Sequence, residues 1–197
     1  MNQQLQELKE LLSKLTARCG ECTVITIDGP AGSGKTSLAK ELSSVLDSCY
    51  TIHMDDLYEG WDSTLNLKLT TKLKTILSGV KNENRISFLP FDWVESRFGS
   101  EIDLPAPKNL IIEGVGSGQS ALRDFISLAL WIEVSPDLGL ERVIKRDGPA
   151  VAQFMPEFMA AQDLHFAKEA TKKSADYRLS GQGTGCSGNK YMIFASR

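Results

Sequence analysis

A glycine-rich segment that follows an apolar run constrains this chain more than any other feature of its sequence. Residues 29–36 read Gly-Pro-Ala-Gly-Ser-Gly-Lys-Thr and fit the pattern G-x-x-x-x-G-K-[ST] at every fixed position. Residues 24–27 before it are Val-Ile-Thr-Ile, and residues 37–46 after it have helical character. Such a loop curls around an anion, with backbone N–H groups and the positive end of the following helix pointing inward. The pattern predicts a strand, a phosphate-binding loop (P-loop) and a helix in succession.

The P-loop residues have separate expected roles in binding a nucleoside triphosphate, for which we expect ATP. Lys35 is expected to reach the β- and γ-phosphates, and the Thr36 hydroxyl to ligate Mg²⁺. Guanine specificity is disfavoured, because the Asn189-Lys190 pair is followed by Tyr191-Met192 and does not complete N-K-x-D. The expected nucleotide-binding residues are Gly29, Ala31, Gly32, Ser33, Gly34, Lys35, Thr36 and Ser37.

Composition narrows the class of protein. The chain has 197 residues, of which 42% are hydrophobic, so we expect a single domain over residues 1–197. A net charge of −3 argues against nucleic acid or an anionic membrane surface as a partner, since both favour clustered Lys and Arg. The apolar runs are shorter than a bilayer requires and the N-terminus does not resemble a signal peptide. These features predict a cytoplasmic protein and leave its oligomeric state open.

The four cysteines are too few and too scattered to predict a disulfide framework. Cys19-Gly-Glu-Cys22 has two interpretations. A zinc site would need two further ligands from Cys49, Cys186, His53 and His165, whereas the alternative is a turn before the first strand.

Hydrophobic periodicity predicts strands alternating with helices. Leu5, Leu8, Leu12 and Leu15 indicate an amphipathic helix within residues 1–20. We expect strands at 23–28, 50–54, 109–113, 128–134 and 176–179. Helices are expected at 37–46, 63–77, 136–147 and 154–173. The remaining expectations are an extended segment at 85–93, a loop around Pro105 and Pro107, and a loop at 181–188 before a closing segment at 191–194. This order predicts a three-layer α/β/α P-loop fold with a mainly parallel five-stranded sheet, in which residues 136–173 form a helical lid and the helix after it.

Two acidic side chains follow predicted strands and are expected at the same sheet edge as the P-loop. Asp55 is placed to accept a proton from an alcohol, although a helix N-cap and a metal ligand are alternative roles. Asp56 is expected to be secondary. Glu113 ends an apolar run, which is typical of a carboxylate that holds Mg²⁺ directly or through water.

Basic residues on the predicted lid are further candidates. Arg142 and Arg146 lie four residues apart on one helix face, from which they can close over a triphosphate and neutralise developing charge. The alternative is a solvated face on which they pair with Glu141 or Asp147. His165 is expected to be a packed side chain rather than a catalytic one.

With these residues in view, the chain resembles the uridine kinase group of P-loop kinases over most of residues 23–180. The resemblance lies in the segment 27–36, in Met-Asp-Asp-Leu-Tyr at 54–58, in Ile-Glu-Gly at 112–114 and in Arg-Val-Ile-Lys-Arg-Asp at 142–147. It implies that Asp55 activates a sugar hydroxyl, that Tyr58 helps to hold a nucleoside, that Glu113 lies beside the metal and that residues 142–147 form the lid.

The resemblance is weaker in the segment with which uridine kinases recognise the pyrimidine base. Uridine kinases carry P-x-Y-D-F followed by a histidine, whereas this chain has Pro90-Phe91-Asp92-Trp93 and no histidine nearby. The sequence therefore predicts ATP- and Mg²⁺-dependent phosphoryl transfer to a small-molecule hydroxyl, with a nucleoside as the first candidate and Phe91, Asp92 and Arg97 as candidate substrate contacts. Another alcohol, a nucleoside monophosphate, and a nucleotide-dependent ATPase or regulator without an acceptor are the alternatives.

Overall fold

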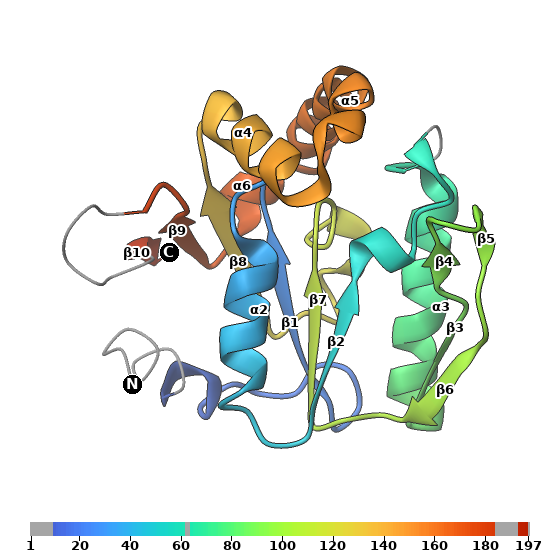
Figure 1. The fold of residues 1–197 in the computed structure, drawn as a ribbon. Coiled ribbons are helices and arrows are strands. Elements are labelled where there is room, and N and C mark those ends of the chain that lie inside the picture. The colour runs from blue at the N-terminus through green and yellow to red at the C-terminus, as the bar shows by residue number, and fades with distance from the viewer. Residues whose placement is uncertain (1–9, 62–63, 184–192, 197) are drawn as a thin grey trace.

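A central β-sheet runs through the computed structural model, which describes residues 10–61, 64–183 and 193–196 (Figure 1). Five of its strands are parallel, and a sixth pairs antiparallel at one edge. In spatial order they are β10 (Ile193–Ser196), β9 (Tyr177–Ser180), β8 (Leu128–Glu133), β1 (Thr23–Asp28), β7 (Asn109–Glu113) and β2 (Cys49–His53). The predicted α/β fold with a five-stranded parallel sheet is confirmed, and β10 adds the sixth strand.

Helices cover both faces of this sheet. The longer ones are α2 (Lys35–Ser43), α3 (Leu67–Glu83), α4 (Pro136–Asp147) and α5 (Met155–Glu169), and the short ones are α6 (Thr171–Ser174) and the 3₁₀ helices η1 (Met54–Asp56), η3 (Ser120–Leu122) and η4 (Pro149–Gln153). The predicted helix at 154–173 is interrupted at Ala170, which has a positive φ of 51°. Helices α4 and α5 stand above the carboxyl ends of the parallel strands (Figure 1).

The alternation of side chains along β1 separates two hydrophobic cores. Val24 belongs to the core under α3, whereas Ile25 and Ile27 belong to the core under α2. The α2 core includes Leu38, Ala39 and Leu42 from that helix, and the α3 core includes Leu69, Leu73, Ile76, Leu77 and Val80. Because each buried aliphatic side chain stabilises the fold by about 1.5–3 kcal/mol, these cores fix the strands that carry the site.

Residues 85–105 form two small hairpin-like sheets beside α3. Strand β3 (Arg85–Phe88) pairs antiparallel with β6 (Ile102–Pro105), and β4 (Phe91–Asp92) pairs with β5 (Arg97–Phe98). The expectation of a loop at Pro105 was wrong, because this proline ends β6 opposite Arg85. Proline is tolerated there because a strand at a sheet edge leaves one side without partners.

Four features considered in the sequence analysis lie near the chain ends. Residues 10–12 are helical and Leu12 is buried in the α2 core; residues 1–9 of the predicted N-terminal helix lie outside the described residues. Most of the predicted loop at 181–188, the Asn189-Lys190 pair and the start of the 191–194 segment also lie outside them. Within the described part of the chain, no helix combines the length and apolar character needed to cross a membrane.

Candidate active site

The P-loop connects β1 to α2 through three glycines with positive φ, at Gly29 (142°), Gly32 (71°) and Gly34 (99°). A Cβ on Gly29 would lie 2.1 Å from the Ile132 carbonyl oxygen, and one on Gly32 would lie 2.1 Å from the Gly139 oxygen. Helix α2 begins with no acidic residue in its first turn and no side-chain cap. The first turn of the helix therefore contributes no negative side chain of its own to this positive end, which suits a phosphate.

Lys35 is buried and points into the P-loop. Its Nζ donates hydrogen bonds to the carbonyl oxygens of Gly29, at 2.9 Å, and Pro30, at 2.8 Å. Burial lowers the pKa of the ammonium group, and the nearby carboxylates of Glu113, Asp28 and Asp55 oppose that shift. The loop therefore keeps a desolvated cation at the position where a phosphate would lie.

Thr36, Glu113 and His53 form a hydrogen-bonded group at the ends of α2, β7 and β2. The Thr36 hydroxyl donates to Glu113 Oε1 over 2.9 Å, and His53 Nδ1 lies 2.6 Å from the same oxygen. This hydrogen bond raises the pKa of His53. The role of His53 was missed by sequence reasoning, although the parallel register that places His53 opposite Glu113 would have indicated it.

Asp55 lies on η1, two residues beyond the end of β2, and its side chain lines a cavity. The carboxylate is accessible from that cavity but has protein around its other sides, and this loss of bulk water raises its pKa. Glu113 raises it further, while Lys35 and Arg146 act in the opposite direction. A carboxylate with a raised pKa beside a cation is suited to accepting a proton.

The two arginines of the predicted lid, both on α4, have different partners. Arg142 Nη1 donates to the carbonyl oxygens of Gly181, at 2.6 Å, and Gly32, at 3.3 Å, and so links the P-loop to the end of β9. Arg146 pairs with Asp147 through two hydrogen bonds of 2.6 and 2.7 Å, as the alternative interpretation expected. Its charge still lowers the pKa of Asp55, so it faces the same site.

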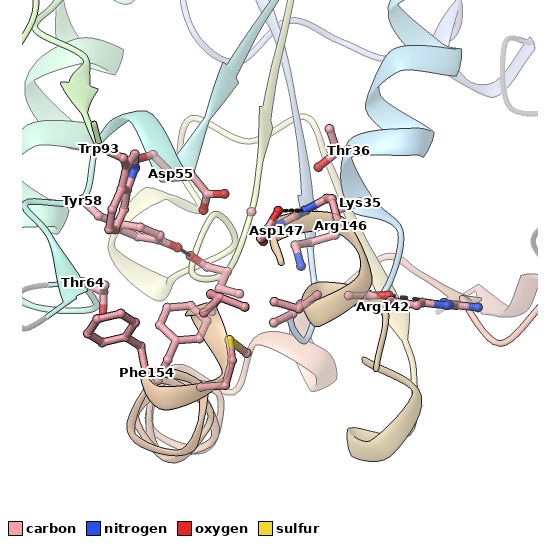
Figure 2. A pocket seen from close by; sticks show the side chains of 18 of the residues that line it. Lys35, Thr36, Asp55, Tyr58, Thr64, Trp93, Arg142, Arg146, Asp147 and Phe154 are labelled. Atoms are coloured by element: carbon pink, nitrogen blue, oxygen red, sulfur yellow. Dashed lines mark hydrogen bonds and ion pairs between the residues drawn. The ribbon is translucent and has the colours of Figure 1, made fainter. Parts of the chain in front are cut away.

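A cavity of about 780 Å³ brings most of the predicted site residues together. Figure 2 shows Asp55 between a charged side, with Lys35, Thr36, Arg142 and Arg146, and an apolar side, with Tyr58, Trp93 and Phe154. The predicted residues on its wall are Ala31, Gly32, Gly34, Lys35, Thr36, Ser37, Asp55, Tyr58, Glu113, Arg142 and Arg146. Gly29 and Ser33 shape the P-loop without lining the cavity.

The three other predicted substrate contacts lie outside the cavity wall. Phe91 packs edge-to-face against Trp93 and Phe98. Asp92 accepts hydrogen bonds from the backbone N–H groups of Val94 and Glu95, and so shapes the turn of the hairpin. Arg97 is exposed and lies 3.9 Å from a Glu95 oxygen.

Aromatic side chains line the apolar side of the cavity instead. Trp61, Trp93, Phe154 and Phe158 are lining residues that were not assigned to the site from sequence. Phe154 and Phe158 lie four residues apart at the start of α5, but Trp61 and Trp93 come from two other segments, so only the tertiary structure gathers all four. Tyr58, which was predicted, also lines the cavity, and its hydroxyl donates to the Val115 carbonyl oxygen over 2.7 Å.

Cys19 and Cys22 face each other across an isolated antiparallel bridge, and both are buried. Burial raises the pKa of Cys19 to about 11 and that of Cys22 to about 12, so both side chains are neutral thiols at pH 7. Among the described residues, no group of three or more His, Cys, Asp or Glu side chains is placed to hold a metal. Cys186, one of the ligands a zinc site would require, lies outside the described residues.

Comparisons with known proteins show similarity over most of the chain. A family model described as "AAA domain" matches residues 25–165. A uridine kinase from Borrelia hermsii is 23% identical over 180 residues, covering 78% of this chain and 84% of its own length. Uridine-cytidine kinase C of Dictyostelium discoideum is 28% identical over 139 residues, which cover 65% of this chain and 30% of the relative.

Solved structures show the same fold. A possible uridine kinase from Bacillus stearothermophilus superimposes with a TM-score of 0.62 at 23% identity, over 88% of this chain and 96% of that one. A putative fructose transport system kinase from Silicibacter gives a TM-score of 0.58 at 16% identity, over 89% and 96%. The chain belongs to the AAA domain family and is a uridine kinase-like P-loop protein.

Proposed function

We propose that this chain is an ATP- and Mg²⁺-dependent kinase that transfers the γ-phosphoryl group to a hydroxyl of a small molecule. The observation that carries the proposal is the placement of Asp55 in one cavity with Lys35 and the Thr36–Glu113 pair. Phosphoryl transfer requires positioning, positive charge around the phosphates and an acceptor that can lose its proton. The cavity offers one group for each requirement.

The P-loop and Lys35 hold the triphosphate in this proposal. The uncapped end of α2 binds phosphate oxygens, and Lys35 Nζ exchanges its two carbonyl partners for them. Arg146 faces the same region and balances charge that builds up during transfer.

The donor set beside the P-loop fits Mg²⁺, because it consists of a hydroxyl and a carboxylate 2.9 Å apart. Mg²⁺ is usually held by one or two carboxylates together with substrate phosphates. Thr36 and Glu113 would hold the ion, with Asp55 as a further oxygen donor, and His53 fixes the orientation of Glu113. When bound, Mg²⁺ neutralises negative charge on the phosphates.

Asp55 acts as the general base. As the acceptor oxygen forms its bond to the γ-phosphorus, the bond from that phosphorus to the bridging oxygen breaks, and ADP leaves with the electron pair. The acceptor proton passes to a carboxylate oxygen of Asp55. The relatives named as uridine and uridine-cytidine kinases make a nucleoside the first acceptor to test.

The test compares Asp55→Asn with Asp56→Asn, which changes the neighbouring carboxylate that does not line the cavity. We expect Asp55→Asn to lower kcat about 10²- to 10⁴-fold, because the amide cannot take the proton, while ATP affinity stays within a few-fold. Asp56→Asn is expected to keep most of the activity. ADP release and ATP binding, measured with a panel of nucleosides, nucleoside monophosphates and alcohols, give both quantities. Equal turnover by wild type and Asp55→Asn, unaffected by any acceptor, would instead indicate a nucleotide-dependent ATPase or regulator.

A further inference from the structure

The apolar side of the cavity is an aromatic wall, which we define as Trp61, Trp93, Phe154 and Phe158. Trp61 stacks on Phe154 with ring centroids 4.9 Å apart and planes 2° from parallel. Trp93 lies 5.2 Å from Trp61, and Phe158 meets Trp61 edge-on at 6.0 Å. Trp61 is therefore held on several sides by other rings, so the wall is an ordered surface.

The cations of the cavity all lie away from this wall. Lys35, Arg142 and Arg146 are the positively charged side chains among the described residues that line the cavity. Lys35 binds P-loop carbonyls, Arg142 binds the carbonyls of Gly32 and Gly181, and Arg146 pairs with Asp147. An acceptor that already carries a phosphate or carboxylate would have to place that charge against aromatic rings, where desolvation is unfavourable.

Among the polar groups on the apolar side, where Thr64 also lines the cavity, the Trp93 indole N–H and the Tyr58 hydroxyl already have protein partners. The indole N–H of Trp93 donates to the backbone oxygen of Asp55 over 2.9 Å, and the Tyr58 hydroxyl donates to the Val115 oxygen. These two groups do not read the edge of a ligand, whereas the parts of the rings that other rings leave uncovered line the cavity, with Phe154 38% exposed. The Trp93 hydrogen bond also ties the wall to the segment that carries the catalytic carboxylate.

We propose that the acceptor is an uncharged alcohol bearing a flat ring, recognised by stacking on the aromatic wall rather than by charge or by hydrogen bonds to a base edge. This inference rests on the proposed function for its chemistry: the hydroxyl of the ring-bearing alcohol forms the bond to the γ-phosphorus, ADP leaves, and the proton goes to Asp55. Ring shape and neutrality, not the identity of a base, decide which alcohols bind.

Binding is tested apart from turnover, on the wild-type protein with Mg²⁺ and a non-hydrolysable ATP analogue. The probes are 2-naphthylmethanol, its ring-saturated counterpart decahydro-2-naphthylmethanol, and 6-(hydroxymethyl)-2-naphthoate, which adds one carboxylate to the same ring. We expect calorimetry to show the flat neutral alcohol binding at least about tenfold more tightly than either of the others. Equal or tighter binding of the carboxylate or of the saturated alcohol would overturn the inference.

The chain offers a matched pair of variants for the wall. Phe154 is 38% exposed and lines the cavity, whereas Phe98 is 39% exposed and lies outside it. Phe154→Leu should weaken 2-naphthylmethanol about tenfold and leave the ATP analogue within twofold, and Phe98→Leu should change neither. Because both side chains are partly exposed, both variants should fold, and circular dichroism checks this. Equal effects of the two variants would contradict a role of the wall in binding.

Turnover separates this inference from the proposed function. If the flat alcohol binds as expected but ATP is converted only to ADP and inorganic phosphate, the kinase proposal fails while the ligand class stands. If ring-free glycerol is phosphorylated as efficiently as 2-naphthylmethanol, the kinase proposal stands and the acceptor class is wrong.

Discussion

Asp28, the last residue of β1, joins the P-loop to the segment that follows β7. Its carboxylate accepts hydrogen bonds from the backbone N–H groups of Gly29, at 2.7 Å, Gly116, at 3.0 Å, and Gly118, at 2.8 Å. The side chain is only 1% exposed, and this burial raises its pKa to about 6 despite the three hydrogen bonds. A carboxylate of this kind connects two functional loops at some cost to stability when it is ionised.

The raised pKa of Asp28 predicts a pH dependence of folding. The unfolded chain releases this proton near pH 3.8, whereas the folded chain keeps it up to about pH 6. The folded state therefore binds more protons between these values, and the Asp28 contribution to the free energy of unfolding falls by about 2 kcal/mol as pH rises from 4 to 6, out of about 3 kcal/mol over the full titration. About one pH unit above the folded-state pKa, Asp28 is ionised in both states and its contribution becomes constant.

Urea unfolding of wild type and Asp28→Asn between pH 4 and 7 gives the difference between their free energies of unfolding. The contributions of the other carboxylates cancel in this difference, which leaves that of Asp28. We expect the stability of the variant relative to wild type to improve across that window. Asp124→Asn, which changes an exposed carboxylate on a nearby segment, is the control and should show no such trend. A pH-independent difference for Asp28→Asn would show that Asp28 titrates alike in both states.

Among individual residues, the sequence predicted those whose neighbours along the chain form a recognisable pattern. Glu113 was found because it ends an apolar strand, and Asp55 because it follows one. Trp61 and Phe154 had no such signal, since an isolated aromatic residue in an α/β domain is more often part of the core. Their stacking depends on packing between segments far apart in the sequence, which no local pattern encodes.

At the level of whole elements, the backbone of helix α4 packs directly against the backbone of the P-loop. Gly139 permits this, because a Cβ there would lie 2.6 Å from the Ala31 carbonyl oxygen. The same helix carries Arg142, whose hydrogen bonds reach Gly32 and Gly181. The position of α4 and the shape of the P-loop are therefore linked.

Gly139→Ala is expected to displace α4 from the P-loop and weaken ATP binding about tenfold or more, since overpacking costs about 1–3 kcal/mol. Helix propensity alone would favour alanine. Gly79→Ala on α3 is the control, because its Cβ would meet the Arg85 oxygen at 3.2 Å, far from the nucleotide site, and ATP affinity should stay unchanged. Calorimetric titration measures the ATP affinity of wild type and of both variants. Equal affinities for wild type and Gly139→Ala would contradict the packing argument.

Elements were predictable where burial imposes a continuous apolar run. Strand β7 was predicted at its observed bounds, Asn109–Glu113, because both faces of a central parallel strand are covered. Strands β5 and β6 were missed, since they form short hairpins with mostly exposed side chains and weak alternation. Pro105 strengthened the expectation of a loop, although an edge strand can end on proline.

For the whole molecule, the strand order explains why distant residues share one cavity. Strand β1 lies between β7 and β8, so the chain after β1 and the chain after β7 emerge at the same edge of the sheet (Figure 1). Ligands of open α/β sheets bind at that carboxyl edge. The P-loop follows β1, Asp55 follows β2 and Glu113 ends β7, and helices α4 and α5 cover them from above.

The most direct test of the account is phosphorus NMR of the wild-type protein incubated with ATP, Mg²⁺ and either uridine or 2-naphthylmethanol. The account predicts a new phosphate monoester signal that grows in equal amount with ADP, and its absence with Asp55→Asn. Growth of inorganic phosphate in equal amount with ADP, without an ester signal for either acceptor, would contradict phosphoryl transfer to an alcohol and identify the cavity as a site of ATP hydrolysis.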